Sequence, residues 1–177
     1  MPDDKLPGWG AVVDPLTIGS KFAGLEPVRR RRGDGAVHES KTLGRLQFVW
    51  MPAGRPSFWH GALPGADGGT ELKLVCEVEG DEPPGADHAA CVVAIRRRQR
   101  KDAEACIGLV RARLRTMQSP LEPEASDLQL VGIHLPPKPM IAARQVLEFR
   151  IAAAPALLFL AVFVHGRPSA VHVDSDA

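Results

Sequence analysis

The segment that most constrains the fold lies near the C-terminus, where residues 152–164 are all apolar or proline. These thirteen residues are too few to cross a membrane, because a membrane-spanning helix needs about 20. Within them, Leu157–Val164 (LLFLAVFV) is apolar at every position, whereas a strand with one exposed face alternates between apolar and polar residues. We therefore predict a central strand that is covered on both faces of a sheet.

Six other segments have the character of strands. In the clearest of them, residues 70–79, leucine, cysteine and valine alternate with lysine and glutamate, which is the period of a strand with one buried face. The predicted strands besides 157–164 are 43–51, 57–63, 70–79, 128–135, 145–151 and 169–174. The first three follow one another through short connections, so we predict that they form an antiparallel meander.

Between residues 84 and 117 the apolar residues recur every three or four positions, which is typical of a helix that packs on a core. We predict two helices here, one from about residue 84 to Gln99 and a second over Lys101–Met117, which Pro120 would end. Strands, then helices, then strands predict an α+β fold. Its sheet would be antiparallel, with about six to seven strands and both helices on one face.

Residues 1–42 differ from the rest of the chain, because proline, glycine and the run Arg29–Arg32 interrupt every periodic pattern. We expect an irregular N-terminal arm over residues 1–42 and a single α+β domain over residues 43–177. A total of 177 residues is within the usual length of one domain.

The charges of the chain almost cancel, with 22 lysines and arginines against 21 aspartates and glutamates. Such a chain lacks the overall positive field that draws a protein to nucleic acid or to an acidic membrane. The N-terminus has no apolar run of signal-peptide length, and Cys76, Cys91 and Cys106 form no CxxC pair. These features predict a cytoplasmic protein with free cysteines.

The common signatures of active sites are absent from the sequence. It has no GxSxG elbow, no GxxxxGK[ST] phosphate loop, no HExxH and no GxGxxG after a strand. The six histidines stand singly, without the close spacing that metal sites use. We therefore expect no metal, no cofactor and no membrane partner.

One pair of residues supports an enzymatic alternative. His88 lies three positions before Cys91, so the two side chains would share a helix face, and a cysteine nucleophile needs such a base. Cys91 also lies in the apolar stretch AACVVAI, where burial raises the pKa of a thiol and favours a structural role. An enzyme that acts through Cys91 and His88 therefore stays an alternative.

Arginine gathers at Arg29–Arg32 and again at the expected joint between the two helices. Guanidinium groups that converge there could contact phosphate or an acidic protein. Because tryptophan and arginine anchor many protein interfaces, we select five candidate binding residues: Trp59, Arg96, Arg97, Arg98 and Arg100. Trp59 could equally be a core residue, and weak nucleic-acid binding through the arginines is a further alternative, although no aromatic residue stands among them.

Several short motifs occur in a characteristic order. They are a G-x-L strand (Gly44, Leu46), a W-x-G strand (Trp59, Gly61), an L-x-L strand (Leu72, Leu74), the acidic stretch Asp81–Pro84, a helical segment, and closing strands with Gly166 and Asp174. In this order the chain resembles, over about residues 43–174, a group of bacterial domains of unknown function. Many members carry a Glu-His pair before the penultimate strand, where this chain has Pro155–Leu158, so no role of that pair transfers.

Domains of this group often lie beside toxin systems, so the resemblance implies an immunity or accessory role and brings no catalytic residue with it. Our functional prediction is a non-enzymatic protein-binding module, most specifically a bacterial immunity-like or accessory protein that binds a partner toxin. The alternatives are an enzyme that uses Cys91 and His88, or a weak nucleic-acid binder.

Overall fold

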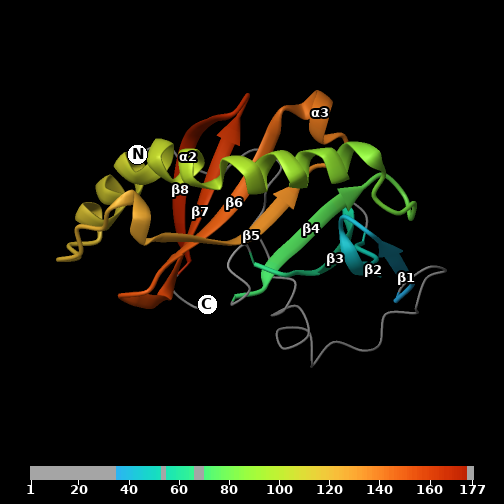
Figure 1. Ribbon diagram of the computed structural model, residues 1–177, viewed down its shortest axis with the longest axis horizontal. Helices are drawn as coiled ribbons and strands as arrows, with labels where there is room; N and C mark the ends of the chain where they lie inside the picture. The colour runs from blue at the N-terminus through green and yellow to red at the C-terminus, as the bar shows by residue number, and fades with distance from the viewer. Residues whose placement is uncertain (1–34, 53–54, 66–69, 175–177) are drawn as a thin grey trace. The chain divides into compact units, whose positions relative to one another are not determined.

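The computed structural model describes residues 35–52, 55–65 and 70–174, and the structural statements below concern these residues. They form eight strands, one long helix and two short helices (Figure 1). In chain order the elements are β1 (Val37–Ser40), β2 (Gly44–Val49), β3 (Ser57–Leu63), β4 (Leu72–Val78), α2 (Ala86–Thr116), the 3-10 helix η1 (Ala125–Asp127), β5 (Leu128–Leu135), α3 (Pro139–Ala142), β6 (Arg144–Ile151), β7 (Ala154–Val164) and β8 (Arg167–Asp174).

All eight strands belong to one sheet, and their order in space follows their order along the chain. Neighbouring strands pair antiparallel except β4 and β5, which run parallel. A parallel pair needs a long crossover connection, which is usually a helix, and α2 fills this role. The sheet therefore consists of two antiparallel meanders, β1–β4 and β5–β8, which meet at the parallel β4·β5 pair. We call this pair the seam.

Helix α2 is continuous over 31 residues and crosses one face of the sheet (Figure 1). The predicted joint near Gln99 is therefore wrong. Neither glycine nor proline occurs between residues 86 and 107, and the arginine, glutamine, lysine and alanine residues around position 99 all favour a helix. Despite its length α2 is highly charged, and no helix in the described ranges is apolar enough over a sufficient length to cross a membrane.

The hydrophobic core lies between α2 and the sheet face that it covers. From α2, side chains such as Val92, Cys106 and Leu114 are buried against strand residues such as Leu74 and Phe149. Burying each large apolar side chain contributes about 1.5–3 kcal/mol. This layer therefore supplies the main driving force that holds α2 on the sheet.

The apolar segment near the C-terminus is buried on both faces, as predicted. In β7, Phe159, Ala161 and Phe163 belong to the core beneath α2, and Leu158, Leu160 and Val162 are buried on the other side of the sheet. The predicted central position is wrong, because the strand lies between β6 and the edge strand β8 and is the seventh of eight. Burial on two faces does not require a place in the middle of the sheet.

The predicted α+β class is confirmed, but three details differ. The sheet is mixed and has eight strands, rather than antiparallel with six to seven, and one long helix replaces the predicted pair. Strand β1 comes from the expected irregular arm, since Val37–Ser40 pairs with β2. The described residues, from 35 to 174, belong to one compact unit, and residues 1–34 of the predicted arm lie outside them.

Candidate functional site

The sheet face turned away from α2 brings ionisable residues of three neighbouring strands together. The register pairs Lys73 of β4 with Gly132 of β5, and Gly132 with Glu148 of β6. One row further along, β5 contributes His134 to the same face. Since residues paired across a sheet share a face, Lys73, His134 and Glu148 form a cluster that spans the seam. We call it the seam cluster.

A single carboxylate oxygen organises the seam cluster. Lys73 Nζ lies 3.2 Å from Glu148 Oε1 and donates a hydrogen bond to it, and His134 Nε2 is hydrogen-bonded to the same oxygen. The side chains of His134 and Glu148 are only 4% and 3% exposed, and that of Lys73 is 15% exposed. A carboxylate this deeply buried is stable only when it is paired and hydrogen-bonded, and here two donors meet that need.

Gly132 makes room for the carboxylate. A Cβ atom at this position would overlap the Glu148 side chain and would lie 2.6 Å from its Cδ. Glycine inside a strand weakens the strand and often marks a close approach of another group. The missing side chain of Gly132 therefore allows Glu148 to lie flat against β5.

The seam cluster also sets the ionisation of Glu148. Burial alone raises the pKa of this carboxyl, but the hydrogen bond and charge of His134 and the charge of Lys73 lower it below its ordinary value. The net decrease in pKa means that the attraction outweighs the desolvation. Glu148 is therefore an anion in the folded protein at neutral pH.

Two further groups on this face have shifted pKa values. Burial raises the pKa of Glu77 to about 7, although the positive charge of Arg144 acts in the opposite direction. Burial and then the charge of Lys73 lower the pKa of His60. Glu77 is thus the described carboxyl whose protonation changes close to neutral pH.

His88 and Cys91, the enzymatic alternative, are not arranged for catalysis. The ring of His88 is buried with Nε2 3.2 Å from the carbonyl oxygen of Pro136, and burial lowers its pKa despite this contact. Burial likewise raises the pKa of the Cys91 thiol, whose sulfur lies 3.6 Å from that of Met140. A nucleophilic cysteine needs a lowered pKa and a base in contact, and neither is found in the described part of the chain.

Trp59, one of the five candidate binding residues, belongs to the core. It is 4% exposed, its ring centre lies 5.2 Å from that of Phe48, and its indole nitrogen donates a hydrogen bond of 3.0 Å to the carbonyl oxygen of Glu82. Its polar atom is therefore satisfied within the fold. Of the two alternatives for Trp59, a binding residue or a core residue, the structure shows the core residue.

The four candidate arginines lie on consecutive turns of one helix and do not converge at a joint. Arg96 donates to the carbonyl oxygen of Pro64 at 2.9 Å. Arg98 pairs at 3.0 Å with Asp102, whose pKa is raised by burial although Arg98 opposes the shift. Arg100 pairs with Glu104 at 3.4 Å, and both side chains are exposed. Arg97 is exposed, with no ion pair found among the described residues.

The solvent side of α2 nevertheless carries a line of positive charge. Arg97 and Arg115 are 18 residues apart, which is about five turns at 3.6 residues per turn, so they point the same way. Arg100 and Lys101 lie within about a turn of Arg97 on this side, and all four residues are exposed. We call these four residues the α2 ridge.

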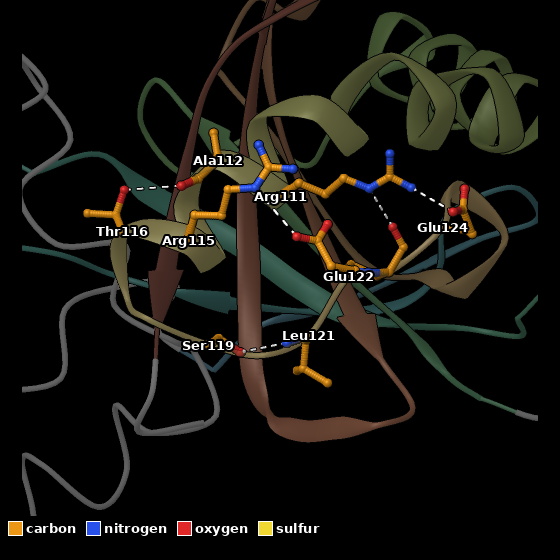
Figure 2. A network of polar contacts seen from close by, with 9 residues as sticks. Arg111, Ala112, Arg115, Thr116, Ser119, Leu121, Glu122 and Glu124 are labelled. Carbon is orange, nitrogen blue, oxygen red and sulfur yellow. Dashed lines mark hydrogen bonds and ion pairs between the residues drawn. The ribbon is translucent and has the colours of Figure 1, made fainter.

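The C-terminal end of α2 is tied to the segment that returns to the sheet (Figure 2). Arg111 donates through Nε to the carbonyl oxygen of Pro123 at 2.8 Å and pairs through Nη2 with Glu124 at 2.9 Å. Arg115 lies 3.5 Å from Glu122, with both side chains mostly exposed. Two arginines therefore hold the last turns of the helix against residues 122–124.

A groove of about 1190 Å³ lies between α2, residues 121–130 and the β6–β7 turn. Its carboxylates already have partners. Glu104 pairs with Arg100, Glu122 and Glu124 pair with arginines of α2, and Asp127 accepts a hydrogen bond of 2.8 Å from the backbone of Glu124. The groove therefore presents polar groups that are engaged with one another and not aimed at a ligand.

Within the described ranges, no three histidine, cysteine or carboxylate side chains lie together as metal ligands would. Cys76 and Cys106 are buried and free, and burial raises the pKa of each thiol to about 12. They behave as small apolar side chains of the core.

No protein-family model matches the chain, and no curated protein or solved structure is detectably similar to it. The resemblance to bacterial domains of unknown function therefore stays a prediction.

Sequence reasoning missed the seam cluster. The alternation in β4 and β6 correctly separates Lys73 and Glu148 from the apolar face, but this pattern predicts exposure to water and not burial. The sequence did contain one signal for the cluster. Gly132 and His134 are two residues apart on β5, so a position without a side chain and a hydrogen-bonding imidazole lie on the same face. Only the register brings Glu148 opposite that space.

Proposed function

We propose that this protein is a non-enzymatic module that binds a protein partner through the α2 ridge. The partner surface would be acidic, because Arg97 and Lys101 of the ridge are exposed and no ion pair of either is found among the described residues. Arg100 and Arg115 already pair with Glu104 and Glu122. Complementary charges guide association and set specificity.

The distribution of charge is the observation that carries this proposal. Helix α2 contains eight basic and three acidic residues, a net charge of +5. The remaining residues of the chain contain 14 basic and 18 acidic residues, a net charge of −4. A chain that is almost neutral overall therefore concentrates positive charge on one exposed element, where a partner can reach it.

The form of the ridge favours a protein over a nucleic acid. Helix α2 has no phenylalanine, tryptophan or tyrosine, so it lacks the stacking surfaces on which single strands are held. The negative charge on the rest of the chain opposes a phosphate backbone. Small residues on the same side of the helix, such as Ala94, Ala105 and Ala112, are exposed and let a protein surface approach closely.

The arrangement of reactive side chains supports a non-enzymatic role. Glu148 and His134 are bonded to each other, His88 faces a backbone carbonyl, and Asp102 pairs with Arg98. A catalytic acid or base must reach its substrate in a cleft. These groups are directed at neighbours within the fold instead.

A more specific form of the proposal is an immunity-like or accessory protein that occludes a partner toxin in the bacterial cytoplasm. It is supported by the resemblance to domains found beside toxin systems and by the two-signed surface, which suits a protein interface.

The test is affinity purification of the full chain from its native host, followed by binding measurements with the purified partner. Wild type is compared with Arg97→Glu/Lys101→Glu and with a matched control, Arg55→Glu/Arg167→Glu, which changes the same number of exposed arginine or lysine charges outside α2. We expect an acidic partner at about equal stoichiometry with wild type and control. The ridge variant should weaken its Kd at least about 10-fold, and added salt should weaken wild-type binding.

Three results would contradict the proposal: no stoichiometric partner under any condition, equal loss of binding in both double variants, or oligonucleotide binding that only the ridge variant loses. The last result would favour the nucleic-acid alternative.

A further inference from the structure

The seam is the strand pairing that joins the two meanders, and it is short. The register of β4 with β5 covers four residue pairs, from Lys73↔Gly132 to Cys76↔Leu135. The outer pairings β1·β2 and β2·β3 also have four, whereas the flanking pairing β3·β4 has seven and β6·β7 has eight. Parallel pairing is also slightly less stable per residue than antiparallel pairing. The integrity of the sheet therefore depends on what reinforces this one pair of strands.

Side-chain contacts cross the seam at several points along its length. At one end, Gln129 donates to Thr70 at 2.8 Å. In the middle, Lys73 of β4 reaches over Gly132 to Glu148 of β6. At the other end, Lys138 pairs with Glu79 at 2.9 Å. The outer contacts are exposed, and exposed pairs contribute little, so the buried seam cluster is the contact with the greatest effect on the seam.

We propose that the seam cluster is an ionic lock that holds the two meanders in one sheet, and that loss of the negative charge on Glu148 lets the seam open before the rest of the fold. The lock depends on the charge of Glu148, because its carboxylate fills the space beside Gly132 and is held there by hydrogen bonds with Lys73 and His134. A neutral or displaced side chain there removes the carboxylate that Lys73 and His134 share, and removing one partner of a buried pair costs more than the pair contributes when intact.

Several other ionisable groups share this face of the sheet. By strand alternation and register they are Glu39 of β1, Arg45 of β2, His60 of β3, Glu77 of β4, Arg144 and Arg150 of β6, and Arg167, His172 and Asp174 of β8. Lys73 and His134 contact Glu148 directly, and the others stand in neighbouring rows or on strands further away. Protonation of Glu148 should therefore weaken the lock more than a change of charge on any of the more distant groups.

The direction of the acid response follows from the pairing. The pKa of Glu148 is held below its ordinary value of 4.5, so the lock is complete above pH 4.5. It is lost as the pH falls through the lowered pKa of the folded state.

The test is residue-resolved hydrogen–deuterium exchange of the full chain at pH 7, with wild type compared with Glu148→Gln. In the variant, backbone amides of the seam (residues 73–76 and 132–135) should exchange about 100-fold faster or more, as expected when one partner of a buried pair is removed. Amides of the edge strand β8, which can open without breaking the lock, should change less than about threefold. In both proteins the seam should exchange at least about tenfold faster than the buried centre of β7.

The matched control is Glu104→Gln, which removes the exposed partner of Arg100 and should leave seam exchange unchanged. If Glu148→Gln yields no folded protein, Gly132→Ala serves in its place, since its Cβ displaces the same carboxylate and keeps the charge.

A second readout is the acid response itself. As the pH is lowered from 5 to 3.5, the exchange rate of the seam amides, divided by the intrinsic rate of an unprotected amide at the same pH, should rise in wild type. It should stay flat in Lys73→Met/His134→Leu/Glu148→Leu, in which apolar packing replaces the ions. Unchanged seam exchange in Glu148→Gln would overturn the lock. So would equal exchange at the seam and the β7 centre, or the same acid response in wild type and the triple variant.

Discussion

Phe149 and Glu148 are neighbours in β6, yet their side chains lie on opposite faces of the sheet and are held there by different forces. Phe149 is 0% exposed and packs in the core beneath α2, and Glu148 is 2% exposed and is held by Lys73 and His134. Apolar packing does not depend on pH, whereas the pairing of Glu148 with Lys73 and His134 stabilises the fold only while Glu148 is charged. The two faces of the sheet are therefore buried almost equally at these two residues, but only the face that carries Glu148 should lose stability when the pH falls.

The largest effect is expected on the α2 face. Phe149→Ala should reduce the free energy of unfolding by about 3–5 kcal/mol, because it leaves a cavity in the core. The loss should be the same at pH 7 and at pH 3.5, measured by urea denaturation at both. A loss that depends on pH would show that the two faces are not independent.

Glu148→Gln tests the opposite face and should be slightly milder. We expect a loss of about 3 kcal/mol at pH 7, since one partner of a buried ion pair is removed. The folded-state pKa of Glu148 is lowered, so the wild-type carboxylate stabilises the fold above pH 4.5 and ceases to do so as the pH falls. The difference between variant and wild type should therefore shrink at pH 3.5, and an unchanged difference would contradict the ionic role.

Glu77→Gln should have a smaller effect of opposite sign. The pKa of Glu77 is raised to about 7 by burial, so the folded state disfavours its ionised form, and wild type loses stability as the pH rises from 4.5 to about 7. The variant should be more stable than wild type at pH 8, by about 1 kcal/mol or less because the side chain is only partly buried. Below pH 4.5 the two should not differ, and thermal melts at pH 8 and pH 4 would check both expectations.

The smallest effect is expected at the surface. Glu104→Gln breaks the i, i+4 pair with Arg100, whose side chain is 93% exposed, and should change the free energy of unfolding by less than about 0.5 kcal/mol. A larger loss in urea denaturation would mean that charge on α2 serves stability, which would weaken the case for α2 as a binding surface.

Much of the fold could be predicted because single segments carry their own pattern. Alternation placed β4 and β6, and a run of apolar residues placed β7, since the side-chain period of a strand is a local property. The break predicted near Gln99 was wrong, because helix formation depends on backbone propensity, and the arginine, glutamine and lysine residues around position 99 favour a helix.

Candidate site residues could be predicted only in part. Trp59 illustrates the limit, because tryptophan is common both in interfaces and in cores, and only the contacts with Phe48 and Glu82 decide between them. The four candidate arginines all lie in α2, which holds a concentration of positive charge, and their binding role stays a prediction. The contact of Arg96 with Pro64, 32 positions away, depends on the fold, whereas the pair of Arg98 with Asp102 is an i, i+4 contact that helix spacing alone allows.

The sequence by itself determined the class of the fold, the faces of its strands and the near-cancellation of its charges, because composition and periodicity are properties of the chain. Tertiary structure alone decided that β4 and β5 run parallel, which side chains of α2 face the core, and that Lys73, His134 and Glu148 meet over Gly132. The physical reason is that the direction and register of strand pairing join residues up to 75 positions apart. The free energy of such a contact belongs to the pair and not to either segment.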